Sequence, residues 1–382
     1  MQNSNKKDNI LILTQRVDIN DDILGFFHGW IAELAKYCEK VTVICLRKGE
    51  YDLPDNVKVL SLGKEQIFNS DNSHLKHSDR IRRFGLYLYR FYKYIWKEKK
   101  NYDSVFAHMN KEYVLMGGLF WRFWGKKIGL WYVHRQVSFA LSMAEKLANV
   151  IFTASRESFR LPSEKVKVMG HGIDVNKFFV KGGFQPKDGQ AASGVKIISV
   201  GRISPIKGYE TLIMAVEILC RNKALPYSDL QVDIVGGPAT LKDEKYLEKL
   251  KKIVQEKKMG DIINFVGSAP NREVIKYYQQ ADLSINLCPT GGMDKAVLES
   301  MACGVPVITL NKTFVKVLEK YKDELILNEK DEKELAEKIK KIINLPQEKK
   351  QSMQKDLRDI VVDNHSLSGL IKNIIKAYDD IK

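Results

Sequence analysis

The stretch KIISVGRISPIKGYETLIMAVEIL, residues 196–219, decides the fold. An apolar run ends at Gly201, the cations Arg202 and Lys207 follow, and an amphipathic helical pattern begins after Gly208. A strand that leads into a helix through a glycine-containing loop is the repeating unit of doubly wound parallel sheets. Ligands of such sheets bind at the carboxyl ends of the strands, where backbone N–H groups and cations meet phosphate. The segment therefore predicts a diphosphate site, and a surface loop with two solvated cations is the alternative.

Outward from this stretch, short apolar runs alternate with helical patterns along both halves of the chain. This alternation predicts α/β architecture, with parallel sheets that are covered by helices. Residues 181–194 are polar and rich in glycine, which is typical of a linker. The predicted strands are residues 10–13, 41–45, 104–107, 128–132 and 150–153 in the first half, and 195–200, 230–235, 262–266, 283–287 and 305–309 in the second.

Composition limits the class of protein. The chain has 382 residues, of which 44% are hydrophobic and 29% charged, and this predicts two globular domains rather than disorder. The five cysteines form no C-x-x-C pair, so we expect buried, reduced thiols in a cytoplasmic protein. We expect neither a signal peptide nor a membrane span, because the apolar runs are too short. The net charge of +15 must face nucleic acid, phospholipid or a phosphorylated substrate.

A second motif, CPTGGMDKAVLESMACGVPVIT, occupies residues 288–309 after a predicted strand. Its glycines precede a helix that starts near Asp294, and the N-terminus of a helix offers unpaired N–H groups and a positive dipole to an anion. Glu299 lies among apolar residues of this helix, where an unpaired carboxylate would be costly to bury. A ribose diol is one partner for Glu299, and a core-facing cation is the alternative.

These motifs resemble a known family. The order of VGRxxxxKG at 200–208, FVGS at 265–268 and LESMACGVPVI at 298–308, with HGIDVNKFF at 171–179, is similar to retaining GT-B glycosyltransferases of glycosyltransferase family 4, the glycosyl transferases group 1. The resemblance implies two Rossmann-like domains that face an interdomain cleft. Residues 1–180 would bind the acceptor and residues 190–362 the nucleotide sugar, and the C-terminal helix within 363–382 would pack back on the first domain.

The resemblance also implies roles for individual residues. Arg202 and Lys207 would stabilise the diphosphate and the leaving nucleotide, Glu299 would bind the ribose, and the backbone near Val266 would meet the base. No metal or further cofactor is implied, because cations and helix N-termini do that work; we favour a UDP-sugar as co-substrate. The remaining expected contacts to the nucleotide sugar are Gly201, Thr290, Gly291 and Gly292.

One position departs from the family pattern. The family usually has a glutamate that contacts the donor sugar eight positions before the ribose-binding glutamate, and this chain has Gly291 there. Asp294 is the nearest carboxylate, so it is a candidate catalytic residue. Backbone amides of Gly291 and Gly292 are a second way to hold the sugar, and Asp294 would then only cap its helix.

The acceptor side has histidines after predicted strands. His134 lies at the position where the family has a histidine that contacts the transferred sugar or assists catalysis, and we favour it over His108. A buried structural histidine is the alternative for both. In the loop and helix at residues 18–30 we expect the acceptor to contact Asp22, Gly25 and His28.

A predicted helix at residues 79–100 carries two stripes. We expect Phe84, Leu88, Phe91 and Ile95 to face the core, and Arg83, Tyr87, Arg90, Tyr94 and Lys97 to lie exposed. Tyrosines between cations are typical of a surface that binds an anionic bilayer, whereas a basic surface with internally packed tyrosines is the alternative. We expect no nucleic acid partner, since no recognised binding motif accompanies the charge.

Together the motifs predict a retaining glycosyltransferase. It would move a sugar from a nucleotide-diphosphate sugar to a lipid-linked or polysaccharide acceptor, as a peripheral protein on the cytoplasmic face of the cell membrane. A GT-B nucleotide-sugar epimerase is the rival enzyme. A non-catalytic, membrane-associated nucleotide-sugar-binding protein is the rival of another class, and Gly291 is the residue that favours it.

Overall fold

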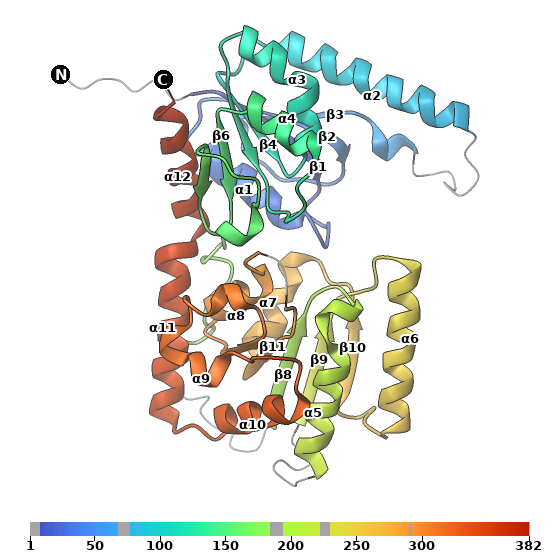
Figure 1. Ribbon diagram of the computed structural model, residues 1–382, viewed down its shortest axis with the longest axis vertical. Helices are drawn as coiled ribbons and strands as arrows, with labels where there is room; N and C mark the ends of the chain where they lie inside the picture. Colours follow the sequence, from blue (N-terminus) through green and yellow to red (C-terminus); the bar gives the residue numbers. More distant parts are fainter. Residues whose placement is uncertain (1–7, 68–76, 184–193, 222–229, 290–291, 382) are drawn as a thin grey trace, which may run out of the picture. The chain divides into compact units, whose positions relative to one another are not determined.

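The computed structural model describes residues 8–67, 77–183, 194–221, 230–289 and 292–381, and most of the predicted linker lies outside them. The chain divides into two compact units (Figure 1). Unit 1 comprises Met1–Gly172 and Leu367–Lys382, and unit 2 comprises Ile173–Ser366. Each unit has its own parallel sheet.

The sheet of unit 1 has seven strands in the order β3-β2-β1-β4-β5-β6-β7, and every pair is parallel. The strand order reverses between β1 and β4, which makes this the topological switch point, where ligands of doubly wound sheets bind. The strands are β1 (Ile10–Val17), β2 (Val41–Lys48), β3 (Val57–Ser61), β4 (Ser104–His108), β5 (Lys127–Trp131), β6 (Val150–Thr153) and β7 (Val166–Val168).

Strand β1 shows why the sheet is buried on both faces. Ile10 and Ile12 pack into one hydrophobic cluster, and Leu11 and Leu13 pack into another. Alternate side chains of a strand point to opposite faces, so a continuous apolar run needs helices on both sides. The helices of unit 1 are α1 (Gly25–Ala35), α2 (His77–Glu98), α3 (Lys111–Phe123), α4 (Phe139–Leu147) and α12 (Leu367–Asp379).

The C-terminal helix α12 packs in unit 1 on the same hydrophobic cluster as α1. The Tyr378 hydroxyl donates a hydrogen bond of 2.7 Å to the Val105 carbonyl oxygen in β4. Gly129 in β5 makes room for this side chain, because a Cβ atom there would lie 2.3 Å from the Tyr378 hydroxyl. The helix is therefore part of the core of unit 1.

Unit 2 has a sheet of five strands in the order β10-β9-β8-β11-β12, again all parallel. Here the switch point lies between β8 and β11. Its strands are β8 (Val195–Val200), β9 (Leu230–Val235), β10 (Ile263–Gly267), β11 (Leu283–Asn286) and β12 (Val307–Thr309). Its helices are α5 (Tyr209–Arg221), α6 (Leu241–Glu256), α7 (Asn271–Gln280), α8 (Lys295–Ala302), α9 (Lys322–Leu325), α10 (Glu332–Ile343) and α11 (Gln347–His365).

The predicted fold class is confirmed, since both units are parallel sheets with helices between the strands. Each of the ten predicted strands corresponds to an observed one. The sequence did not reveal β3 and β7, the two outer strands of the sheet in unit 1. All five cysteines are buried thiols that form no disulfide, as expected.

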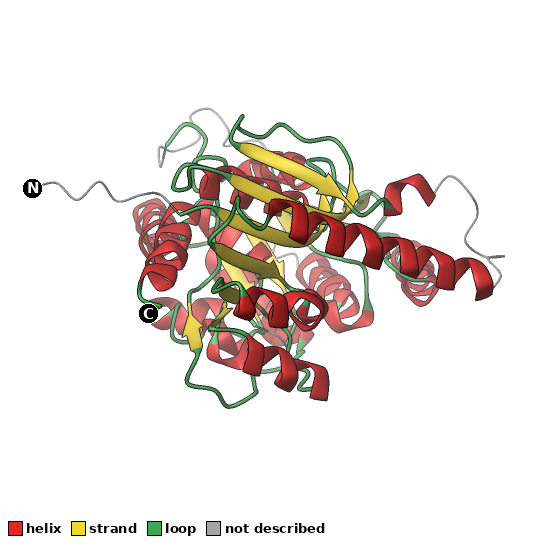
Figure 2. Ribbon diagram, turned by 90° about the horizontal axis from the view of Figure 1, so that it is seen from above, coloured by secondary structure: helices red, strands yellow, loops and turns green. Residues whose placement is uncertain are grey.

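Helix α2 requires a correction. Phe91 and Ile95 are buried as predicted, but Phe84 is 61% exposed, because the first turns of α2 extend beyond the strands of the unit (Figures 1 and 2). Tyr87 and Tyr94, predicted to be exposed, are partly buried and pack against the hydrophobic cluster beneath α2. The exposed face of α2 instead carries Leu86, Tyr89, Lys93, Trp96 and Lys97.

Within the described residues, no helix combines the length and the apolar character that a membrane span requires.

Candidate functional site

The loop after β8 brings Gly201 and Arg202 to the switch point of unit 2. Gly201 has φ of +151°, and Gly236 after β9 approaches it so closely that a Cβ on Gly236 would lie 2.0 Å from the Gly201 carbonyl oxygen. The buried Tyr209 hydroxyl donates a hydrogen bond of 3.1 Å to this oxygen. Arg202 is exposed, and its carbonyl oxygen accepts a hydrogen bond of 3.4 Å from the same Tyr209 hydroxyl. The loop is fixed while the guanidinium faces solvent.

Lys207 and Asp294 form an ion pair between the segments that follow β8 and β11, the two strands at the switch point. The Lys207 ammonium lies 2.8 Å from Oδ2 of Asp294, which follows β11, and Asn286 Nδ2 donates to the same oxygen over 3.1 Å. The other oxygen, Oδ1, accepts from the backbone N–H of Ala296 and so caps α8. Asp294 therefore caps a helix and pairs with a cation at once.

The Lys207–Asp294 pair shifts both groups toward their charged forms. Burial alone would raise the pKa of Asp294, but Lys207 and the hydrogen bonds from Lys207 and Asn286 lower it below its ordinary value. Burial would lower the pKa of Lys207, but Asp294 raises it. The site thus holds a charged lysine whose present counterion is a protein carboxylate, which an anionic ligand can replace.

Glu299 lies on α8 and is buried. Its Oε1 accepts a hydrogen bond of 3.1 Å from Asn271 Nδ2, and Asn271 Oδ1 accepts one of 2.9 Å from the Lys177 ammonium. Burial raises the pKa of Glu299 to about 7, although Lys295 and Asn271 oppose the rise. The surroundings of Glu299 thus fit both partners that the sequence suggested. A cation lies nearby, and the carboxylate retains acceptor capacity for the hydroxyl groups of a ribose.

Of the other expected contacts to the nucleotide sugar, Val266 and Gly292 are among the described residues, and two others are not. Val266 is half-buried in β10, near the carboxyl end of that strand. The carbonyl oxygen of Gly292 accepts a hydrogen bond of 3.0 Å from Asn311, which anchors the loop before α8. Thr290 and Gly291 lie outside the described residues.

In unit 1, His108 and His28 are buried. The His108 ring stacks on Phe27 with centroids 3.8 Å apart, and its Nδ1 lies 3.4 Å from the Thr14 hydroxyl. His28 Nε2 accepts a hydrogen bond from the backbone N–H of Asp52 over 3.1 Å. Such surroundings favour packing roles for both rings, and for His108 this is the alternative that the sequence left open.

His134, Asp22 and Gly25 also belong to unit 1. His134 follows β5, is exposed, and has an edge-to-face contact with Tyr132 at 5.4 Å between ring centroids. Partial burial, and then Lys111, lower its pKa, so the neutral ring that a hydrogen-bond acceptor needs is favoured. Asp22 is exposed, and Gly25 begins α1 where a Cβ would lie 3.2 Å from the Ile19 carbonyl oxygen.

Several residues at these sites carry no signal in the sequence. Tyr209, Asn271 and Lys177 reach the switch-point loops or Glu299 only through the fold. Asn286 ends β11, and a polar residue that closes an apolar strand was the available sign of its role. These residues position the groups that the sequence did identify.

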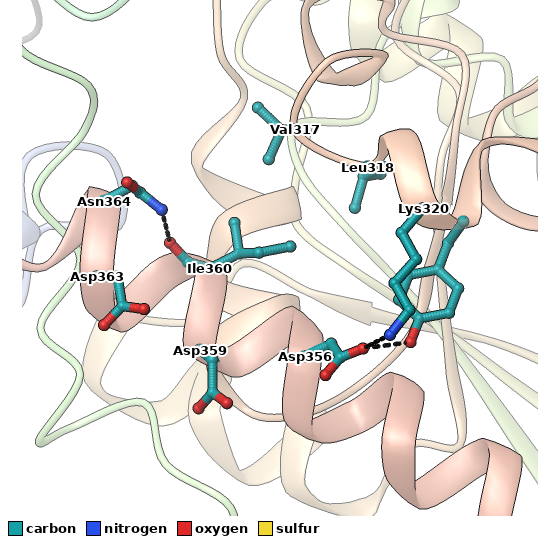
Figure 3. Close-up of a pocket in the computed structure, with 9 residues that line it drawn as sticks. Val317, Leu318, Lys320, Asp356, Asp359, Ile360, Asp363 and Asn364 are labelled. Atoms are coloured by element: carbon teal, nitrogen blue, oxygen red, sulfur yellow. Dashed lines mark hydrogen bonds and ion pairs between the residues drawn. The ribbon is translucent and has the colours of Figure 1, made fainter.

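Unit 2 also has a pocket that lies away from these motifs. Its volume is about 370 Å³, and its lining includes Asp356, Asp359 and Asp363 of α11 (Figure 3). The Tyr321 hydroxyl donates to Asp356 over 2.6 Å, and Lys320 pairs with the same carboxylate. Within the described residues no group of histidine, cysteine or acidic side chains is arranged to hold a metal ion.

Solved structures with the same arrangement define the class of fold. HepE from Anabaena, in complex with UDP and glucose, aligns with a TM-score of 0.72 and 17% identity over 98% of this chain and 100% of that one. The sucrose-phosphate synthase of Thermosynechococcus elongatus aligns with a TM-score of 0.71 and 16% identity over 97% and 98%. The chain therefore has the GT-B fold.

Sequence comparison gives the family. Residues 184–359 match the family of glycosyl transferases group 1, so this part of the chain is similar to that family. The D-inositol 3-phosphate glycosyltransferase of Thermobispora bispora is 28% identical over 172 residues, or 44% of this chain and 40% of that protein. The enzyme of the same name from Frankia alni is 29% identical over 147 residues, or 38% and 36%. The matched part thus spans about two fifths of these relatives.

Proposed function

We propose that the protein transfers a sugar from a UDP-sugar to an acceptor hydroxyl with retention of configuration. The observation that carries this proposal is the pair of cations at the switch point of unit 2. Arg202 is exposed, and Lys207 is paired with a carboxylate that an incoming diphosphate can displace. HepE, which has the same fold, was solved with UDP and glucose, and this supports the choice of nucleotide.

The reaction would need only groups of the chain and its two substrates. The bond between the anomeric carbon and the diphosphate oxygen breaks, and the nucleoside diphosphate leaves with the electron pair. Arg202 and Lys207 would offset the charge that develops on the leaving group, so no metal is required. The acceptor hydroxyl then bonds to the anomeric carbon on the same face and gives its proton to the departing phosphate oxygen.

The family resemblance supplies the other proposed donor contacts. Glu299 would accept hydrogen bonds from the ribose hydroxyls, Val266 would contact the base through its backbone, and Gly201 and Gly292 would line the phosphates. Asp294, released from Lys207 by the diphosphate, would become free to contact the sugar. His134 would bind the transferred sugar from unit 1 as a neutral ring.

For the acceptor we propose a lipid-linked or saccharide molecule, used at the cytoplasmic face of the membrane. The support lies in unit 1, where α2, α3 and α4 expose large apolar side chains beside cations. Lys93 lies 5.8 Å from the centre of the Tyr89 ring, and Lys99 lies 5.2 Å from that of Trp96. Exposed aromatic residues with neighbouring cations suit the headgroup level of an anionic bilayer. The most exposed members are Phe84, Tyr89, Trp96, Leu119, Phe123 and Phe139.

Donor turnover tests the proposal. The purified protein is first screened for thermal stabilisation by UDP-, GDP- and ADP-sugars, since a ligand of the folded state raises its apparent stability. Turnover of the stabilising donor is then measured with membrane lipid extract as acceptor. Arg202→Ala and Lys207→Ala should each remove most transfer, by about 100-fold or more. Near-normal transfer by either variant would refute the diphosphate assignment.

The same assay separates the rival functions. An epimerase would convert the donor to its epimer without any acceptor. A binding protein would be stabilised by the donor and yet neither hydrolyse it nor transfer its sugar. A transferase transfers the sugar only when acceptor is present, apart from slow hydrolysis.

A further inference from the structure

Two hydrogen bonds in series connect Lys177 to the carboxylate of Glu299. The Lys177 ammonium donates to Asn271 Oδ1 over 2.9 Å, and Asn271 Nδ2 donates to Glu299 Oε1 over 3.1 Å. The three residues come from separate parts of unit 2: the segment that opens the unit, the first residue of α7 and the body of α8. They therefore form a relay of hydrogen bonds that only the fold of unit 2 assembles.

The ammonium fixes which way the Asn271 amide points. A lysine ammonium has donors and no acceptor, so only the amide oxygen can face Lys177. The NH₂ group on the other side of the amide then faces Glu299. With the amide turned around, its oxygen would lie against a carboxylate oxygen and repel it. The terminal torsion of asparagine is soft, so this orientation depends on the contact with Lys177.

The amide in turn fixes the carboxylate of Glu299. The terminal torsion of a glutamate is as soft as that of an asparagine, and here the side chain is buried, with the residue 6% exposed. A ribose diol presents two neighbouring hydroxyl groups, and a carboxylate accepts from both most readily when its plane is set before the ligand arrives. The hydrogen bond from Asn271 sets that plane and leaves acceptor capacity on the carboxylate.

The segment that carries Lys177 is itself held in place by Arg358 of α11. The guanidinium donates to the carbonyl oxygens of Val175 over 3.2 Å and of Phe178 over 2.9 Å. It also donates to the carbonyl oxygen of Ala302, the last residue of α8. Because α8 carries the carboxylate of the relay, both ends of the relay are joined by a second route through Arg358.

Burial makes the charge of Lys177 costly to the fold. Burial lowers the pKa of Lys177, and Glu299 and Asp174 oppose this decrease without reversing it. An ammonium with a lowered pKa costs stability relative to an apolar side chain of the same length. Removal of the charge should therefore leave the fold intact, and the contact with Asn271 gives the buried charge a role in the site.

We propose that Lys177 is a positioning residue for the donor nucleotide: through Asn271 it sets the Glu299 carboxylate to accept hydrogen bonds from both hydroxyls of a ribose. The inference rests on the proposed function, in which Glu299 binds the ribose, and it adds the origin of a selectivity for ribonucleotides over deoxyribonucleotides. A nucleotide without the 2′ hydroxyl leaves one acceptor position unfilled, and a buried acceptor without a donor costs binding free energy.

Isothermal titration of the full chain with UDP and with 2′-deoxy-UDP measures this selectivity. The unmodified chain should bind UDP about tenfold more tightly than 2′-deoxy-UDP. Lys177→Met removes the ammonium and should weaken UDP binding by about fivefold, while 2′-deoxy-UDP binding changes by less than about twofold. The retained binding of 2′-deoxy-UDP also shows that the variant is folded. Lys181→Met, at an exposed lysine nearby in the chain, is the matched control and should keep the full selectivity.

A double-mutant cycle tests whether Lys177 acts through Asn271. Asn271→Leu replaces the amide by an apolar side chain of similar shape, so it should lose selectivity as Lys177→Met does. The double variant should then be no less selective than either single variant, because the two changes break the same relay. Losses that add up in the double variant would mean that Lys177 acts on Glu299 by its charge alone, and would overturn the relay.

The outcomes separate this inference from the proposed function. Equal affinity of the unmodified chain for the two nucleotides overturns the inference, as does unchanged selectivity in Lys177→Met. Either result can occur in a chain that transfers sugar from a UDP-sugar. Selective binding of UDP without any turnover of a UDP-sugar instead refutes the proposed function and leaves the relay in place.

Discussion

The ammonium of Lys207 lies 2.8 Å from Oδ2 of Asp294, so the loops after β8 and β11 are tied together across the switch point of unit 2. This ion pair occupies the lysine that the proposed diphosphate site requires. Binding of a diphosphate therefore replaces one anion by another, and part of its affinity is lost to that exchange.

Asp294→Asn tests this competition. The amide keeps the oxygen that caps α8 but removes the negative charge. We expect UDP to bind up to about tenfold more tightly, about 1.4 kcal/mol, as measured by isothermal titration. Asp359→Asn, which breaks an exposed ion pair with Lys355 on α11, is the control. Weaker UDP binding by Asp294→Asn would mean that the carboxylate positions Lys207 rather than competes for it.

Glu299 gives the protein a predicted dependence on pH. Its pKa is about 7 in the folded chain, above the ordinary value of about 4.3 for an unfolded glutamate. The folded state therefore binds more protons than the unfolded state between these values, and stability falls as pH rises through that window. Glu299→Gln removes the effect, so its stability relative to the unmodified chain should rise by up to about 3 kcal/mol between pH 4.5 and 7.

Urea unfolding at several pH values measures this difference. Glu248→Gln, at an exposed carboxylate of α6, is the control and should differ from the unmodified chain by a constant amount. A constant difference for Glu299→Gln as well would show that burial does not hold the proton on Glu299.

Much of the fold was readable because the buried strands contain short apolar runs, as in Val150–Thr153, which was predicted at its observed bounds. Strand β3 was missed because its lysine and its half-buried side chains make it look like a surface segment. Phe84 shows another limit. Its spacing with Phe91 is that of a core stripe, but periodicity cannot reveal where a helix extends beyond its sheet.

Individual site residues were readable only when a motif carried them. Arg202, Lys207 and Glu299 belong to recognisable stretches, whereas Asn271 reaches Glu299 from another helix, 28 positions away in the chain. His108 ends a strand just as a ligand-binding residue would, and its stacking on Phe27 depends on how α1 packs. Such pairings arise from tertiary structure and leave no local pattern.

Gly236 is predicted to be essential for the shape of the donor loop. Its φ is +141°, and a Cβ there would lie 2.0 Å from the backbone oxygen of Gly201. Gly236→Ala should lower the free energy of unfolding by about 2 to 4 kcal/mol, through strain and overlap, and weaken UDP binding. Gly260→Ala is a matched control, because a Cβ at Gly260 has nothing within 4 Å; its effect should stay within about 0.5 kcal/mol. Equal denaturation midpoints for the two variants would contradict the prediction.

The exposed apolar face of unit 1 gives a prediction about membranes. Trp96 of α2 is 53% exposed and Phe123 of α3 is 88% exposed, and Phe120 of α3 lies 6.0 Å from Trp96 between ring centroids. Burial of a large apolar side chain in the bilayer interface contributes about 1.5 to 3 kcal/mol, so Trp96→Ser with Phe123→Ser should weaken binding to phosphatidylglycerol vesicles at least 100-fold.

Co-sedimentation with vesicles measures this binding. The control is Leu241→Ser with Phe179→Ser, which removes two exposed apolar side chains from unit 2 and should leave binding unchanged. Binding should also weaken as salt rises from 0.05 to about 0.5 M, because the exposed Lys93 and Lys97 would face the lipid phosphates and salt screens exposed charges. If both double variants sediment alike, the apolar face of α2 and α3 does not contact the bilayer. If salt alone abolishes binding of the unmodified chain while the serine substitutions do not, the attraction comes from the overall positive charge of the protein, and the aromatic side chains have another partner.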